Sequence, residues 1–141
     1  MAGVALKTAP FQAISSIRWQ GCQPECFVLS LPIHTISESN ARHHWAVKSR
    51  RVKEQRTQTS NALQSNLGAL ATPPVTAEVR LLRVGARQLD DDNLRSSLKA
   101  VRDGVADWLK IDDGKHNITW RYAQENGKAY SVEIAAALEW N

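Results

Sequence analysis

The apolar pattern of residues 92–110 constrains the fold of this 141-residue chain more than any other segment. In DNLRSSLKAVRDGVADWLK, the large apolar side chains recur at alternating spacings of four and three residues, which places them on one face of a helix. They are Leu94, Leu98, Val101, Val105 and Trp108. A second stripe is basic and consists of Arg95, Lys99 and Arg102. The pattern predicts an amphipathic helix, capped by Asp92 or Asn93, that buries one face against another layer.

Strands are predicted around this helix. The segments with the required alternation are residues 26–33, 75–84, 117–124 and 128–135. A second, mostly polar helix is predicted over residues 41–67, before the helix-breaking pair Pro73-Pro74. Asn126-Gly127 is a strong turn signal and predicts that the last two strands form a hairpin. The order βαβαββ indicates an α+β (mixed α/β) domain, in which two helices pack on a small mixed sheet of about four strands.

Residues 1–24 show no clear periodicity and are interpreted as a poorly defined N-terminal extension, so the single domain is predicted over residues 25–141. No apolar run approaches the about 20 residues that span a bilayer, and the N-terminus lacks the apolar core of a signal peptide. We therefore expect no membrane association and a cytoplasmic location. Cys22 and Cys26 form a CxxxC pair, and a zinc site would need His43 and His44 as well. Two reduced thiols are the simpler interpretation.

The net charge of +4 conceals an asymmetry. Residues 1–88 carry 11 Lys and Arg against 4 Asp and Glu, whereas residues 89–141 carry 7 against 10. The basic excess peaks in ARHHWAVKSRRVKEQR, and the candidate DNA-binding side chains there are Arg42, Lys48, Arg50, Arg51 and Arg56. Such a patch can neutralise phosphates and release counterions, which favours a nucleic-acid partner. A solvated helix face is the equally open alternative.

Three consecutive aspartates, residues 90–92, lie between the strand predicted over residues 75–84 and the amphipathic helix. Asp90 and Asp92 are two residues apart, and in an extended segment they would point the same way. Two carboxylates aimed at one point repel each other unless a cation lies between them, and Mg²⁺ prefers such hard oxygen ligands. Asp113 follows the helix and could join them. The alternative is structural, because acidic residues cap helices and Asp-Asp-Gly is an ordinary turn.

The ordered set LDDDNL, LKAVRD and LKIDDGK resembles the RusA family of Holliday junction resolvases from bacteriophages and prophages. That family has an Asp-x-Asp-Asn-Leu motif, then a lysine on the following helix, then an Asp-Asp turn. The matching positions are Asp90, Asp92, Asn93, Leu94 and Asp113, and the resemblance covers residues 27–136. The lysine departs from the pattern. In an alignment without gaps, Ser96 stands where the family has its lysine. Lys99 matches that lysine only if one helical turn is inserted. Lys99 would then lie about 10 Å from Asp92 along the helix axis.

The resemblance implies a homodimeric, metal-dependent endonuclease that nicks a four-way DNA junction symmetrically. Asp90, Asp92 and Asp113 would hold Mg²⁺, with Mn²⁺ as a substitute, and Lys99 would place a charge near the scissile phosphate. Arg95 is the nearer cation and a further DNA-binding candidate. Two alternatives stay open: a phage nuclease of the same fold that acts on other branched DNA, and a non-catalytic DNA-binding protein with a degenerate site.

Overall fold

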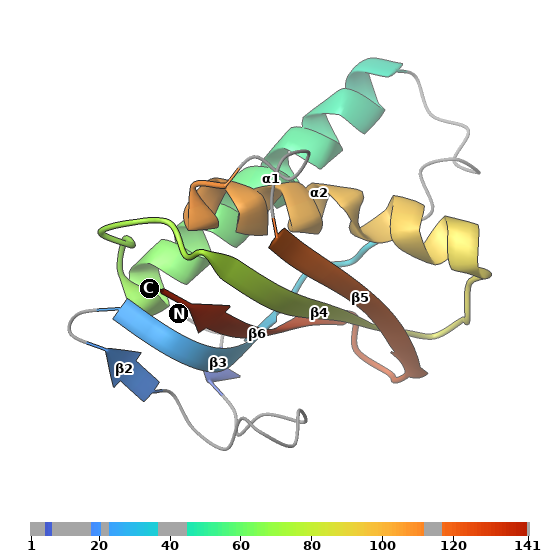
Figure 1. Cartoon of the computed structure of the whole chain (residues 1–141). Coiled ribbons are helices and arrows are strands. Elements are labelled where there is room, and N and C mark those ends of the chain that lie inside the picture. Colours follow the sequence, from blue (N-terminus) through green and yellow to red (C-terminus); the bar gives the residue numbers. More distant parts are fainter. Residues whose placement is uncertain (1–4, 7–17, 21–22, 37–44, 112–116, 141) are drawn as a thin grey trace.

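A computed structural model describes residues 5–6, 18–20, 23–36, 45–111 and 117–140. It contains eight elements in chain order (Figure 1). They are β1 (Ala5–Leu6), β2 (Arg18–Gln20), β3 (Gln23–Leu31), α1 (Trp45–Leu67), β4 (Thr76–Gly85), α2 (Asp91–Leu109), β5 (Asn117–Asn126) and β6 (Ser131–Glu139). The four segments predicted as strands and the two predicted as helices all form the expected type of element. The α+β class is therefore confirmed.

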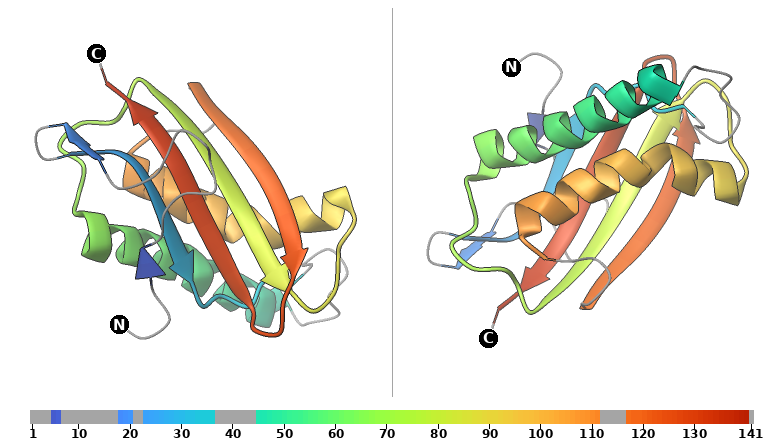
Figure 2. Two further views of the ribbon diagram at one scale, coloured as in Figure 1. Left: turned by 90° about the horizontal axis from the view of Figure 1, so that it is seen from below. Right: turned by 90° about the horizontal axis from the view of Figure 1, so that it is seen from above.

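The long strands form one mixed sheet in the order β3-β6-β4-β5. Strands β4 and β5 are parallel, and β6 is antiparallel to both of its neighbours, β3 and β4. Both helices lie on the same face of this sheet, behind it when seen from below and in front of it when seen from above (Figure 2). The short strands β1 and β2 pair with β3, so parts of the segment predicted as an extension belong to the sheet.

The predicted hairpin between the last two strands is wrong, because β4 lies between β5 and β6. Residues 132–136 of β6 are all buried, which is typical of a central strand that needs a hydrogen-bonded neighbour on each side. Strand β5 is more polar and takes the edge of the sheet. The chain after Asn126 passes over the end of β4, where the Gly127 N–H donates to the carbonyl of Gly85 at 3.0 Å.

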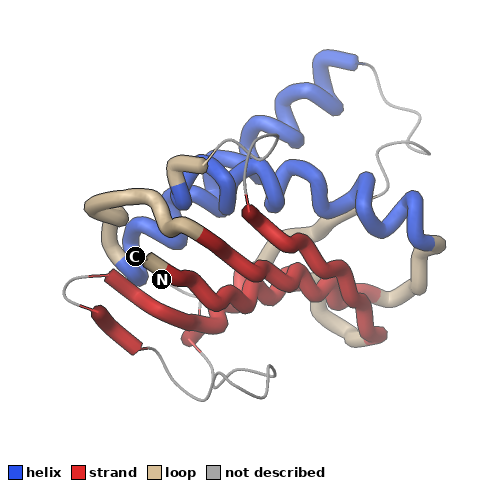
Figure 3. Tube along the Cα trace, viewed as in Figure 1, coloured by secondary structure: helices blue, strands red, loops and turns tan. Residues whose placement is uncertain are grey.

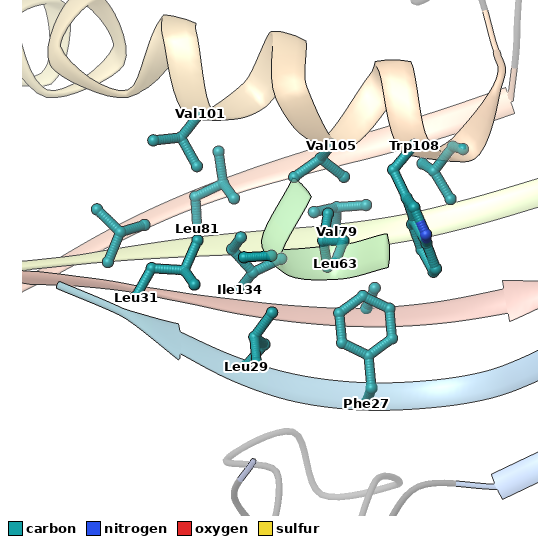
Figure 4. Close-up of a cluster of buried hydrophobic side chains, with 14 of the residues drawn as sticks. Phe27, Leu29, Leu31, Leu63, Val79, Leu81, Val101, Val105, Trp108 and Ile134 are labelled. Carbon is teal, nitrogen blue, oxygen red and sulfur yellow. The ribbon is translucent and has the colours of Figure 1, made fainter. Parts of the chain in front are cut away.

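The core lies between the sheet and the helices (Figure 4). All five predicted apolar side chains of α2 are buried, with exposed fractions of 5% or less. The indole of Trp108 meets the ring of Phe27 edge-on, with centroids 5.5 Å apart, and its Nε1–H donates to the carbonyl of Gly68 at 2.9 Å. Leu81 and Ile134 fill the space between these layers. The burial of this one face fixes how α2 is oriented about its axis.

The buried residues of helix α1 begin at Gln55, near its middle. Ala62, Leu63 and Leu67 face the core, whereas Trp45 at the start of the helix is 74% exposed. In Figure 1, α1 rises away from the sheet toward that end. This mostly polar helix therefore packs on the core only where the sheet lies beneath it. No helix within the described residues combines the length and the hydropathy that crossing a membrane requires.

The two helices approach each other closely at Gly104 of α2. A Cβ atom placed on Gly104 would lie 2.5 Å from the carbonyl oxygen of Arg56 and 2.7 Å from Cβ of Thr59. Backbone cannot move aside as a flexible side chain can, so only glycine permits this helix separation.

We predict that Gly104→Ala lowers the free energy of unfolding by about 1–3 kcal/mol, because overpacking outweighs the better helix propensity of alanine. Urea denaturation measures this value. The exposed Asn61→Ala on α1 serves as the control and should change stability little. A Gly104→Ala protein as stable as wild type would contradict the close helix contact.

Candidate functional site at the start of helix α2

Asp90 is the N-cap of α2, so the prediction of Asp92 or Asn93 as the cap is wrong. Its backbone is extended, with φ −68° and ψ 169°, and its Oδ1 accepts from the backbone N–H of Asn93 at 2.9 Å. Asp91 and Asp92 occupy the first helical turn and are exposed. Three carboxylates therefore surround the positive end of the helix dipole, which stabilises negative charge there.

A side chain from the neighbouring strand fixes the segment that leads into this cap. The loop between β4 and α2 (Figure 3) contains Leu89, and the side-chain amide of Gln124 on β5 holds both of its backbone polar groups. Gln124 Oε1 accepts from the Leu89 N–H at 2.9 Å, and Nε2 donates to the Leu89 carbonyl at 2.7 Å. Two hydrogen bonds thus position the residue directly before Asp90. Nothing local in the sequence identifies Gln124 as their source.

The three proposed metal ligands do not all lie in described parts of the chain. Asp90 is extended and Asp92 is helical, so the strand alternation that would point both side chains one way does not apply. Asp113 lies outside the described residues, as does Asp112. Within the described residues, no group of three or more His, Cys, Asp or Glu side chains could hold a metal. The three-carboxylate set therefore stays a prediction.

The carboxylates that are described suit a hard cation chemically. A carboxylate offers about four lone-pair positions, so the hydrogen bond that Asp90 accepts as a cap leaves capacity for a metal. Asp92 is exposed at the first turn of α2. Asp91 borders a hollow of about 290 Å³ together with Arg95 and Tyr122. Among the three aspartates, it is the one placed against the basic stripe.

Lys99 and Arg95 lie on the same stripe of α2 but make different contacts. Lys99 Nζ lies 3.0 Å from Asp103 Oδ2, an ion pair one turn along the helix, and the side chain of Lys99 is 72% exposed. The guanidinium of Arg95 lies over the ring of Tyr122, with Cζ 5.5 Å from the ring centroid. Arg95 is thus the cation that is both closer in sequence to the acidic turn and in contact with β5.

A larger hollow, of about 630 Å³, lies between α2 and β5, and we call it the α2–β5 hollow. Its lining residues are Arg95, Ser96, Lys99, Arg102, Trp120 and Tyr122. The basic stripe of α2 was visible in the sequence, and so was the alternation of Trp120 and Tyr122. The sequence did not predict that the basic stripe and these two aromatic residues lie side by side, because the aromatic residues were assigned to a hairpin rather than to a strand parallel to β4.

The basic residues predicted on α1 divide by role. Lys48 and Arg50 are exposed, and Arg51 is half-buried. Arg56 instead bridges the helices, because its Nε and Nη2 donate to the two carboxylate oxygens of Asp107 at 2.7 and 2.8 Å. This guanidinium is therefore engaged in packing α1 on α2. Arg42 lies outside the described residues.

The cysteine prediction is described only in part. Cys26 is buried in β3. Cys22, His43 and His44 lie outside the described residues, so the zinc site and the two reduced thiols both stay predictions.

No known family model matches this chain, and no curated protein matches it either. The resemblance to the RusA family therefore rests on the quoted motifs alone.

We predict that Asp90→Ala destabilises the protein by about 1 kcal/mol, because the N–H of Asn93 loses its side-chain acceptor. Asp90→Asn should retain most of the stability, since an amide oxygen caps nearly as well. Urea denaturation of both variants separates the cap from the charge. Equal losses in the two variants would show that the charge of Asp90, and not its cap oxygen, stabilises the helix.

The bridge between Arg56 and Asp107 predicts a pH dependence of stability. The hydrogen bond from Arg56 lowers the pKa of Asp107, while partial burial opposes that shift. A lowered folded-state pKa contributes stability above the unfolded pKa of about 3.9, and that stability is lost as the pH falls through the folded pKa. Asp107→Asn should therefore be less stable than wild type near neutral pH.

The measurement is urea denaturation of wild type and Asp107→Asn over a pH series. The difference between them should shrink as the pH drops below about 4. The exposed Glu54→Gln on α1 is the control for general loss of negative charge. A difference that stays constant across the series would contradict the ion-pair origin of the stabilisation.

Proposed function

We propose that this protein is a Mg²⁺-dependent, structure-specific endodeoxyribonuclease that resolves four-way DNA junctions by paired nicks, acting as a homodimer. The observation that carries the proposal is the change of charge along α2. Acidic residues 90–92 surround its N-terminus, and the basic stripe begins at Arg95, within the next turn. A nuclease needs both charges side by side: carboxylates for a metal, and cations for the phosphate backbone.

Each residue has a role in this proposal. Asp90, Asp92 and Asp113 would hold the metal, which supplies an activated water and stabilises charge on the scissile phosphate when bound. Arg95 or Lys99 would hold a non-bridging oxygen of that phosphate and favour the developing negative charge. Arg95 is the better placed of the two, since Lys99 is paired with Asp103. Lys99 would have to exchange that carboxylate for the phosphate.

The remaining cations would position DNA without reading its sequence. Lys48, Arg50 and Arg51 on α1 would contact backbone phosphates, as basic helix faces do. Arg56 is removed from this set, because DNA contact would require breaking its two hydrogen bonds to Asp107. Selection of a four-way junction over a flap or fork would come from the relative placement of the two subunits. Other branched DNA therefore remains an alternative substrate.

A second candidate function is a non-catalytic DNA-binding protein. Two contacts favour it: Asp90 already serves as a helix cap, and Lys99 is already paired. For both candidate functions we propose a cytoplasmic location in a bacterial host and a phage or prophage origin.

We predict that the protein cuts a synthetic four-way junction with paired nicks in Mg²⁺ or Mn²⁺, and that Asp92→Asn binds the junction without cutting it. Glu139→Gln is the matched control, because Glu139 is exposed on β6 and pairs in register with Thr76, at the opposite end of β4 from Asp90. Loss of one metal ligand should lower the cleavage rate by at least about 10-fold.

Gel-based cleavage assays on junction, flap and fork substrates test this prediction. Equal cleavage by wild type and Asp92→Asn would overturn the catalytic assignment. Faster cleavage of flaps or forks would favour the alternative nuclease. Calorimetric titration that detects no Mg²⁺ or Mn²⁺ binding, together with intact junction binding, would favour the non-catalytic candidate.

A further inference from the structure

The α2–β5 hollow combines three cations with two aromatic rings at the edge of the sheet. Its volume of about 630 Å³ lies inside the range of about 300–1,000 Å³ that is typical of ligand pockets. Strand β5 is the last strand of the sheet order on this side, and α2 crosses above it (Figure 2). A chain-like ligand can therefore reach the hollow from beyond the edge of the sheet.

The cations are held in place by the rings beneath them. Arg102 lies over Trp120, with Cζ 4.9 Å from the ring centroid, and its Nη1 donates to the hydroxyl of Tyr122 at 3.1 Å. Arg95 lies over Tyr122. These contacts orient two guanidinium groups toward one hollow before any ligand is present, so less side-chain entropy is lost on binding.

The local charge balance favours an anionic ligand. Arg95, Lys99 and Arg102 line the hollow, and no carboxylate is among the described residues that line it. Asp103 offsets Lys99 through their ion pair. In the contacts given above, the guanidinium groups of Arg95 and Arg102 lie over rings, and a planar guanidinium is well suited to a phosphate.

The rings narrow the ligand class further. Sites for single-stranded nucleic acid combine a positively charged groove with aromatic side chains against which bases stack. A plain anion would use Trp120 and Tyr122 only through the guanidinium groups that they orient, and a neutral aromatic compound would make no use of the cations. A nucleotide within a strand uses both.

The hollow also adjoins the acidic end of α2. The smaller hollow that contains Asp91 shares Arg95, Trp120 and Tyr122 with the larger one. A strand lying in the α2–β5 hollow would therefore continue directly toward residues 90–92.

We propose that the α2–β5 hollow holds one unpaired nucleotide of single-stranded DNA, with its phosphate on Arg95, Lys99 and Arg102 and its base against those parts of Trp120 and Tyr122 that line the hollow beside the guanidinium groups. This inference rests on the DNA-binding part of the proposed function but does not depend on cleavage. It assigns the hollow to a strand released from base pairing, adjacent to the acidic turn.

The test measures binding of a short fluorescein-labelled oligothymidylate to the full chain by anisotropy, in EDTA so that no divalent metal is present. Trp120→Ala should weaken binding by about 5- to 150-fold, the range for one stacked base. An oligonucleotide of the same length with abasic sites should bind wild type more weakly by a similar factor. It should bind Trp120→Ala and wild type about equally.

Lys99→Gln provides a second variant that keeps the fold, because this side chain is 72% exposed. It should reduce the slope of log affinity against log salt by about 0.7 for a single strand. Lys128→Gln is the matched control, since Lys128 is exposed and lies outside the hollow. The affinity of Lys128→Gln for the oligonucleotide should be closer to that of wild type than the affinity of Lys99→Gln is.

Two results would overturn the inference: oligothymidylate binding that is unchanged in both Trp120→Ala and Lys99→Gln, or abasic and normal strands that bind wild type equally. Binding that follows the expected pattern, in a protein that does not cut junctions, would support the hollow and reject the nuclease. Junction cleavage by wild type, together with single-strand binding that is unchanged in both variants, would reject the hollow alone.

Discussion

The positions of the candidate functional side chains on α2 depend on the burial of one face of that helix against the sheet. Leu98, Val101 and Val105 have no exposed surface, and Trp108 is held both by Phe27 and by its hydrogen bond to Gly68. With that face fixed, the rotation of the helix is fixed as well. The basic stripe must then lie over β5, and the N-terminus of the helix must lie beyond the end of β4.

The elements and the main core face were predictable because they follow from local periodicity. The strand pairing was not. Asn126-Gly127 is a local signal, whereas the place of β6 depends on its need for partners on both sides, which β3 and β4 satisfy. The cap of α2 was misplaced for a related reason. Three consecutive aspartates offer three possible caps. The hydrogen bonds that position the residue before Asp90 come from Gln124, which is 35 residues from Leu89 in the sequence.

Candidate site residues were predictable as residue types but not as contacts. Arg56 and Arg50 look alike in the sequence, yet Arg56 is bound to Asp107 on the other helix and Arg50 is exposed. Lys99 and Arg95 share a stripe, yet one pairs with a carboxylate and the other with an aromatic ring. Composition indicates that a basic surface exists. Only packing decides which cations remain available for a ligand and which hold the fold together.

The central place of β6 has a consequence for synthesis on the ribosome. Strand β6 follows every other described strand in the sequence, so β3 and the β4–β5 pair are made before the strand that joins them. Until residues 131–139 emerge, β3 and β4 each have an unpaired edge in the middle of the future sheet. Exposed edges of this kind recruit other chains. We therefore expect that a nascent chain halted before β6 aggregates more readily than the completed protein.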